Sequence, residues 1–299
     1  MRLAISHYCT TTTTLMMYIK QLLALLLVGR SAADAKTALV PKTSLLNEKA
    51  LLVRGGAGPL DVKTTAKVMS GILGAQSAYN YLAPEKNNEA YGLTDCDDVT
   101  NWLSKGSGAV MGSAAIAAIA ILYFDMDPIK ALGAGTLLGT VHSLEVVLTE
   151  GAAKVGFSPV GQWLDLIINA FMSHTFLTGA DYAQTAGKVY AAFSLLVGIQ
   201  CRLAPQKGLE TWGLEGEASD NALFFTKILG QLCVASGVFI GAISSGVDPS
   251  TALGYYYIPM LLSFVEFIAS GESDDVGIGK EIQYPWILAS AATIGTLSF

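Results

Sequence analysis

Charged residues are scarce in this chain of 299 residues. Asp, Glu, Lys and Arg together make up 14% of the sequence, whereas a soluble domain carries roughly 25%. Hydrophobic residues make up 52%, and the mean hydropathy is +0.47. This composition excludes a disordered chain and disfavours an ordinary soluble enzyme. It predicts an all-α membrane protein that crosses the bilayer several times.

Basic clusters are also missing. The net charge is −6 and the isoelectric point is about 5.1, and no basic patch is interleaved with aromatic residues. Proteins that bind nucleic acids generally carry a basic surface. We therefore expect no nucleic-acid partner.

Cysteines are few and lack a diagnostic spacing. Of the four, Cys9 lies in a segment that we expect to be removed, and the other three, Cys96, Cys201 and Cys233, cannot all pair with one another. No CxxC or His/Cys spacing indicates zinc. A nucleophile elbow, a P-loop, a dinucleotide fingerprint and an HExxH motif are all absent. The sequence therefore assigns no catalytic residue and no metal ligand, and it leaves the cofactor open.

Residues 1–35 have the pattern of a signal peptide. Lys20 precedes a short apolar run over 21–29, and a small-residue site ends at Ala35. That run has about nine residues, which is too short for a bilayer span of about 20. We expect the mature chain to begin at Lys36, in the secretory pathway or an endomembrane.

Residues 36–63 are richer in lysine and arginine than in acidic residues. We interpret this segment as a flexible basic linker or, alternatively, as a second targeting element like that of two-part plastid presequences. Such presequences usually carry an aromatic residue directly after the signal cleavage site, where this chain has Lys36. A plastid membrane is therefore the alternative location.

The rest of the chain repeats itself at an offset of 121 residues. The motif over 82–93 (LAPEKNNEAYGL) recurs over 203–214 with seven of twelve positions identical. Asp127-Pro128 likewise recurs as Asp248-Pro249. A constant offset without gaps predicts a duplication, with one four-helix unit over 64–178 and a second over 185–299.

Each predicted unit contains four apolar segments of helical length. A unit with four spans returns the chain to its starting side, so we expect two parallel units related by an axis along the membrane normal. The sequence therefore predicts eight transmembrane helices. The segments cover about 66–83, 103–124, 129–149 and 161–178 in the first unit, and 187–204, 224–246, 250–270 and 284–299 in the second.

Proline and glycine positions predict where helices begin and end. Pro84 and Pro205 are expected to open a short interfacial helix, which Gly92 and Gly213 can terminate. Pairs of glycines four residues apart predict close helix packing, either within the chain or against other membrane subunits. These pairs are Gly108 with Gly112, Gly135 with Gly139, and Gly237 with Gly241.

Four ionisable residues in the apolar helices form the candidate polar site. Glu145 and Glu266 occupy equivalent positions in the two units, and His142 lies one turn before Glu145. Asp165 lies in the fourth helix of the first unit. Such groups usually face a cavity or a partner, so we expect both glutamates at the interface between the units. The alternative is that each glutamate reaches water near the end of its span.

The four-helix unit resembles small DoxX-like membrane proteins. The similarity consists of the Leu-Ala-Pro … Gly-Leu step after the first helix, four spans, and short helices with polar residues. This resemblance implies a four-helix membrane fold and, in some members, quinone-linked redox work, but no functional residue of that family matches a position here.

Three functional hypotheses follow. The first is a small-solute or proton-coupled carrier with its site between the two units, which the duplication and the paired glutamates favour. The second is a non-catalytic membrane scaffold or complex subunit that packs through its glycine faces. The third is a quinone- or lipid-linked membrane enzyme.

Overall fold

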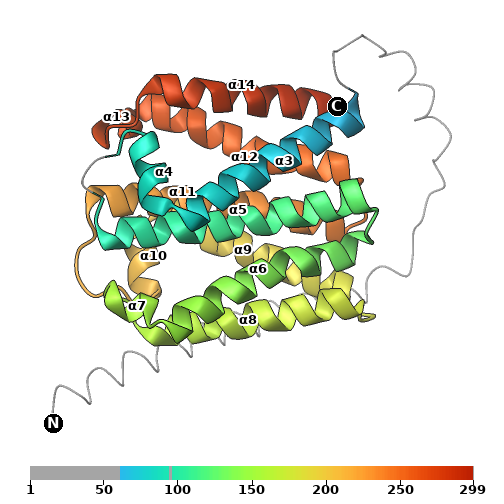
Figure 1. Cartoon of the computed structure of the whole chain (residues 1–299), viewed down its shortest axis with the longest axis horizontal. Coiled ribbons are helices and arrows are strands. Elements are labelled where there is room, and N and C mark those ends of the chain that lie inside the picture. Colours follow the sequence, from blue (N-terminus) through green and yellow to red (C-terminus); the bar gives the residue numbers. More distant parts are fainter. Residues whose placement is uncertain (1–60, 94–95, 299) are drawn as a thin grey trace.

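The structure is a computed structural model that describes residues 61–93 and 96–298 (Figure 1). The expected signal peptide and residues 36–60 of the expected linker lie outside this part. The first described helix, α3, covers Val62–Leu82. Its N-cap is Asp61, whose side chain accepts a hydrogen bond from the backbone N–H of Thr64 at 2.8 Å. The predicted linker therefore extends too far, because its last two residues already belong to a helix.

The described residues are all-helical, and long helices cover all eight apolar segments. Besides α3, the long helices are α5 (Asp98–Phe124), α6 (Pro128–Leu148), α8 (Pro159–Thr178), α9 (Ala183–Leu203), α11 (Asp220–Ser244), α12 (Pro249–Ser270) and α14 (Lys280–Leu297). The short helices are α4 (Pro84–Ala90), α7 (Gly151–Lys154), α10 (Pro205–Thr211) and α13 (Glu272–Asp275). Four helices, α5, α6, α11 and α12, are long and apolar enough to cross a membrane, which is consistent with an integral membrane protein.

Helix starts follow the prolines of the sequence. Pro84 and Pro205 are the first residues of α4 and α10, as predicted. Asp127 caps α6, accepting hydrogen bonds from the backbone N–H groups of residues 129 and 130, and Asp248 caps α12 in the same way. The loops after α4 and α10 turn at glycines with positive φ, at positions 92 and 213.

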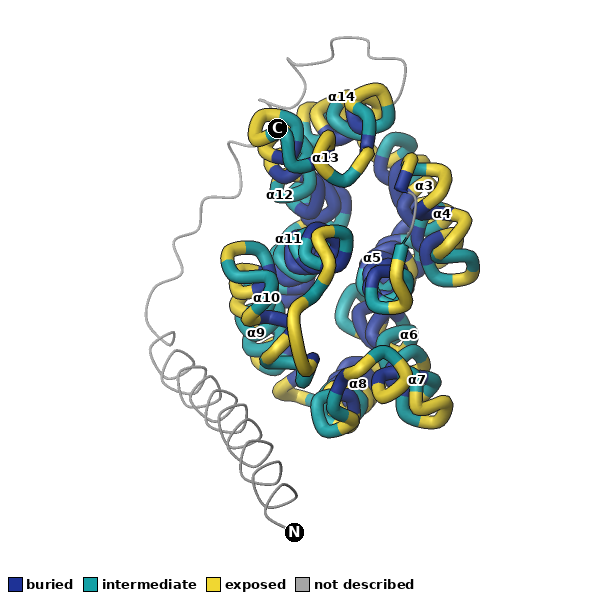
Figure 2. Tube along the Cα trace, turned by 90° about the vertical axis from the view of Figure 1, so that its left-hand side faces the viewer, coloured by how far each residue is buried: buried dark blue, intermediate teal, exposed yellow. Residues whose placement is uncertain are grey.

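The long helices run alternately between two ends of the molecule, and the four short helices gather at one of these ends (Figure 1). We call α3–α8 the N-terminal half and α9–α14 the C-terminal half. Viewed end-on, α5 and α11 contact each other at the centre (Figure 2). The halves also meet where α3 contacts α14, on one side of this central pair, and where α8 contacts α9, on the other side.

Glycines bring helices into close contact within the chain. A Cβ atom on Gly198 of α9 would lie 2.5 Å from the carbonyl oxygen of Gly230 in α11, and the reverse distance is 2.7 Å. The six glycines of the predicted pairs also face helices of this same chain. Gly108 and Gly112 face α3, Gly135 faces α5, Gly139 faces α8, and Gly237 and Gly241 face α9. These glycines pack against helices of the same chain, and packing against other membrane subunits stays a prediction.

Candidate functional site

Two pockets lie between the halves, one on each side of the central helices. Pocket 1, of about 120 Å³, is lined by α3, α4 and α5 on one wall and by α11, α12 and α14 on the other. Pocket 2, of about 230 Å³, lies between α5, α6 and α8 of the N-terminal half and α9 and α11 of the C-terminal half. A water needs about 10–15 Å³ on this measure, so each space can hold a small molecule.

The two pockets are lined by equivalent positions. Each combines the first two long helices of one half with the last three of the other, and many lining residues are related by the 121-residue offset. Gln162 in pocket 2 corresponds to Gln283 in pocket 1, with the same side chain. Other pairs differ: His142 corresponds to Ser263, Asp165 to Trp286, and Asn169 to Ser290. Pocket 2 is therefore lined by an aspartate and a histidine, whereas no Asp, Glu, His, Lys or Arg side chain lines pocket 1.

Asp165 on α8 is the central polar group of pocket 2. Helices surround it, but its side chain is accessible to solvent because it faces the pocket. The hydroxyl of Ser143 on α6 donates a hydrogen bond to its carboxylate. Tyr190 on α9 and Cys233 on α11 line the same pocket. Among the described residues, Asp165 has no ion-pair partner.

Aromatic and hydrogen-bonding side chains form the walls around this carboxylate. Trp102, Phe193 and Trp212 line pocket 2 together with Tyr190. The Tyr190 hydroxyl donates to the side-chain oxygen of Asn169 at 2.8 Å. The pocket therefore presents one carboxylate among several aromatic side chains.

His142 also lines pocket 2, from α6. Its Nδ1 atom is buried without a hydrogen-bond partner. Its ring packs edge-on against Tyr81 of α3, with the ring centroids 5.5 Å apart. His142 therefore lies between the pocket and Tyr81, whose hydroxyl bonds to Glu145.

Glu145 does not lie at the interface between the halves, so this expectation is corrected. Its carboxylate accepts a hydrogen bond from the Tyr81 hydroxyl at 2.6 Å and pairs with the Lys105 ammonium at 2.5 Å. Both partners belong to the N-terminal half, and Glu145 lines neither pocket. The Lys105 ammonium and the Tyr81 hydroxyl stabilise the charge of Glu145. Glu145 therefore needs no partner from the other half.

Glu266 differs from our expectation in the same way. It pairs with Arg202 on α9, again within its own half, and it lines neither pocket. Tyr81 and Arg202 each precede their glutamate by 64 residues and are related by the 121-residue offset. The pair of Tyr81 with Glu145 is therefore equivalent to the pair of Arg202 with Glu266, and each joins the first and third long helices of its half.

Of the four predicted site residues, the structure thus brings Asp165 and His142 into one pocket and leaves both glutamates outside it. Sequence reasoning missed Trp102, Tyr190, Trp212 and Cys233, because no motif or spacing in the sequence connects these residues to Asp165. No group of three or more His, Cys, Asp or Glu side chains that could hold a metal occurs in the described ranges. No protein-family model, curated protein or solved structure matches the chain.

Proposed function

We propose that this protein is an integral membrane protein that carries a small organic cation through pocket 2 in exchange for a proton. The proposal includes eight membrane spans in two tandem, parallel four-helix units. Residence in the secretory pathway or in a plastid membrane stays a prediction, because it depends on residues outside the described part.

Helix length and outward-facing side chains support eight spans. The long helices have between 18 and 27 residues, which corresponds to about 27–40 Å, against a hydrocarbon core of about 30 Å. On α8, Trp163, Ile167 and Phe171 are spaced four residues apart and are 53%, 61% and 54% exposed. Such an apolar stripe suits lipid as its partner.

Matching helix bounds support the duplication. Helices α9, α10 and α13 begin and end 121 residues after α3, α4 and α7. The contacts of α3 with α5, α5 with α6, and α6 with α8 have counterparts between α9 and α11, α11 and α12, and α12 and α14. Two similar four-helix units in one orientation would give this arrangement.

The function rests on the Asp165 carboxylate, which faces pocket 2 without an ion-pair partner in the described part of the chain. An ionised carboxylate at membrane depth carries a large desolvation cost, so it takes up a proton or pairs with a cation. Aromatic faces beside a carboxylate bind organic cations through cation–π attraction. If a bound cation displaces the proton, the two fluxes are coupled one to one.

The test uses the full chain reconstituted into liposomes that contain a pH-sensitive dye. With an acidic interior, adding tetramethylammonium, choline or tetraethylammonium outside should drive cation-dependent proton efflux for at least one of these probes. Asp165→Asn should abolish this efflux, because the amide keeps the shape but cannot exchange a proton.

Glu145→Gln is the matched control, since it makes the same chemical change on a neighbouring helix outside the pocket. It should retain the cation-dependent efflux. Efflux that persists in Asp165→Asn would contradict the proposed function, as would the absence of any response in the wild-type protein.

A further inference from the structure

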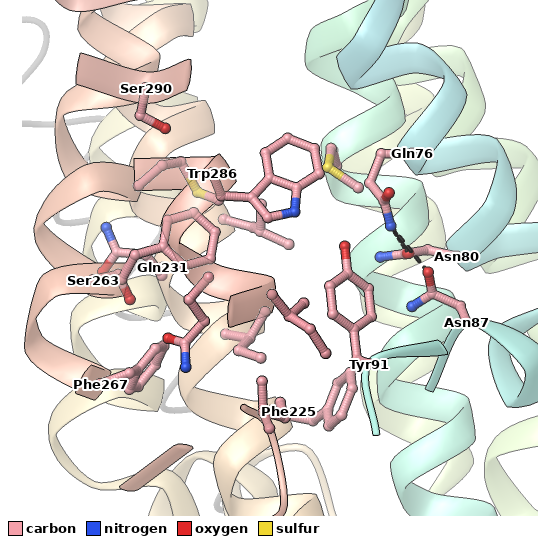
Figure 3. A pocket seen from close by; sticks show the side chains of 18 of the residues that line it. Gln76, Asn80, Asn87, Tyr91, Phe225, Gln231, Ser263, Phe267, Trp286 and Ser290 are labelled. Atoms are coloured by element: carbon pink, nitrogen blue, oxygen red, sulfur yellow. Dashed lines mark hydrogen bonds between the residues drawn. The ribbon is translucent and has the colours of Figure 1, made fainter. Parts of the chain in front are cut away.

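Pocket 1 has a different chemistry from pocket 2. None of its lining residues is charged. Aromatic side chains dominate the wall formed by α11, α12 and α14, and Tyr91 adds an aromatic ring to the opposite wall. The rings of Phe264 and Trp286, both on the first wall, lie nearly parallel, with an interplanar angle of 15° and centroids 6.5 Å apart. Figure 3 shows Trp286 and Tyr91 between the two walls. Flat aromatic faces make the most extensive contact with a flat, rigid molecule, which also loses little conformational entropy on binding.

The wall formed by α12 and α14 holds buried polar atoms without partners. These atoms are the Tyr256 hydroxyl, the Ser263 hydroxyl, the Gln283 Nε2 and the Ser290 hydroxyl, and all four residues line the pocket. Each of these residues is at most 4% exposed. Buried polar groups are nearly always hydrogen-bonded, so four unpaired groups on one wall indicate a missing partner.

The opposite wall already satisfies its polar groups. The side-chain amide of Gln76 donates to Asn80 at 2.8 Å and to Asn87 at 2.9 Å, which links α3 to α4 (Figure 3). Burial raises the pKa of Tyr91, and the Trp286 indole, which hydrogen-bonds to it, offsets this only in part. The phenol is therefore neutral at physiological pH, and the hydrogen-bonding capacity left for a ligand lies mainly on the α12 and α14 wall.

We propose that pocket 1 binds an uncharged, flat, ring-containing lipid of the sterol class, with its single hydroxyl or carbonyl oxygen directed at the unpaired amide of Gln283. The rings would lie among the aromatic side chains, in contact with both halves. The amide N–H of Gln283 can only donate, so it requires an accepting oxygen on the ligand. A charged head group would find no countercharge in this lining. The inference is independent of the solute that pocket 2 takes.

The test is photo-crosslinking of the full chain in phosphatidylcholine nanodiscs. Three probes carry a diazirine: an uncharged sterol labelled on its rings, the sulfate ester of that same sterol, and a straight-chain alcohol. The uncharged sterol should label pocket-facing residues of α12 and α14, and excess unlabelled sterol should remove this labelling. The sulfate ester should label these residues roughly tenfold less, because its charge finds no countercharge in the lining. The chain alcohol should also label them roughly tenfold less, because it lacks the rigid rings that contact the aromatic side chains.

Variants separate pocket binding from contact with bulk lipid. Gln283→Leu combined with Ser290→Ala should lower sterol labelling roughly tenfold, and Met260→Trp should block it by filling the pocket. Leu288→Ala is the control on α14, because Leu288 is 70% exposed and faces away from the pocket; it should leave labelling unchanged.

Stability gives a second readout, so the test does not depend on a single variant. In nanodiscs without sterol, Gln283→Leu should unfold at a higher temperature than the wild type, because it removes an unpaired polar group. Added sterol should stabilise only the wild type. Equal labelling by the sulfate ester or the chain alcohol would overturn the proposal. So would labelling confined to outward positions, or labelling that Met260→Trp leaves unchanged.

Discussion

The hydroxyl of Ser219 donates a hydrogen bond to the carboxylate of Asp97 at 2.7 Å. Asp97 is the N-cap of α5, and Ser219 is the N-cap of α11, where it accepts a hydrogen bond from the backbone N–H of Ala222 at 3.2 Å. The first turns of the two central helices are therefore joined across the halves. Burial alone would raise the pKa of Asp97, but the hydrogen bonds from Thr100 and Ser219 outweigh it and hold this pKa below its usual value.

Asp97→Ala should lower the free energy of unfolding by about 0.5–2 kcal/mol at neutral pH, the usual effect of losing an N-cap. A folded-state pKa below the unfolded value of about 3.9 means that the carboxylate stabilises the fold above that pH. This contribution is lost as the pH falls through the folded-state pKa. Thermal unfolding in detergent at several pH values should therefore show the variant and the wild type converging below about pH 4.

A double-mutant cycle separates the contact between the halves from the two caps. Combining Asp97→Ala with Ser219→Ala should give a coupling energy of about 0.5–1 kcal/mol. Asp61→Ala is the control, since Asp61 caps α3 alone. It should show no coupling with Ser219→Ala, and strictly additive effects of Asp97 and Ser219 would argue against the contact.

Gly135→Ala should destabilise the protein by about 1–3 kcal/mol, as overpacked core positions do. A Cβ atom at this position would overlap the backbone carbonyl oxygen of Ser113, which cannot move without shifting α5. Gly71→Ala is the matched control, because nothing lies within 4 Å of a Cβ atom there. It should be neutral or stabilising, by up to about 1 kcal/mol from helix propensity. Equal unfolding temperatures for the two variants would contradict the close contact of α5 and α6.

The pair of Lys105 and Glu145 should act on stability and not on transport. Lys105→Met should lower the free energy of unfolding by about 1–2 kcal/mol, between the values for exposed and buried pairs, because it leaves the carboxylate with only the Tyr81 hydroxyl. Adding Glu145→Gln should restore part of the loss. Unfolding in detergent measures the effect on stability, and proton efflux measures the effect on transport. Loss of efflux in Glu145→Gln would place this glutamate in the proposed transport pathway.

Asp165→Asn should stabilise the protein while it abolishes transport. The amide can still accept the hydrogen bond from Ser143 but carries no charge into the pocket. An unfolding temperature higher by about 2–4 °C for each kcal/mol gained is expected for a chain of this size. Asp127→Asn makes the same change at a helix cap outside the pockets and should be nearly silent, since asparagine also caps helices well. A less stable Asp165→Asn protein would indicate a structural role for the carboxylate.

Local signals made the helices predictable. Asp127 and Pro128 set the start of α6 through a cap and a fixed φ, and Pro84 sets the start of α4. These effects act within one turn, so the sequence contains them. The position of Asp165 on an apolar helix likewise identified it as a candidate site residue.

Contacts between distant helices made the rest unpredictable. The partners of Glu145 lie 40 and 64 residues away in the chain, so no spacing within a helix indicates them. Pocket 2 needs Tyr190 from the other half, and only the packing of α8 beside α9 brings it near Asn169.

The central contact of α5 with α11 (Figure 2) has a mechanical consequence. The lining residues place pocket 1 on the side of α3 and α14 and pocket 2 on the side of α8 and α9. If the halves rotate as rigid bodies about this contact, α8 moves away from α9 when α3 moves toward α14. Compressing one pocket then dilates the other. A molecule that holds pocket 1 open would lower the affinity of pocket 2 for its ligand. By linkage, a ligand in pocket 2 would lower the affinity of pocket 1 by the same factor. Binding at one site would therefore weaken binding at the other, although the two sites take different ligands.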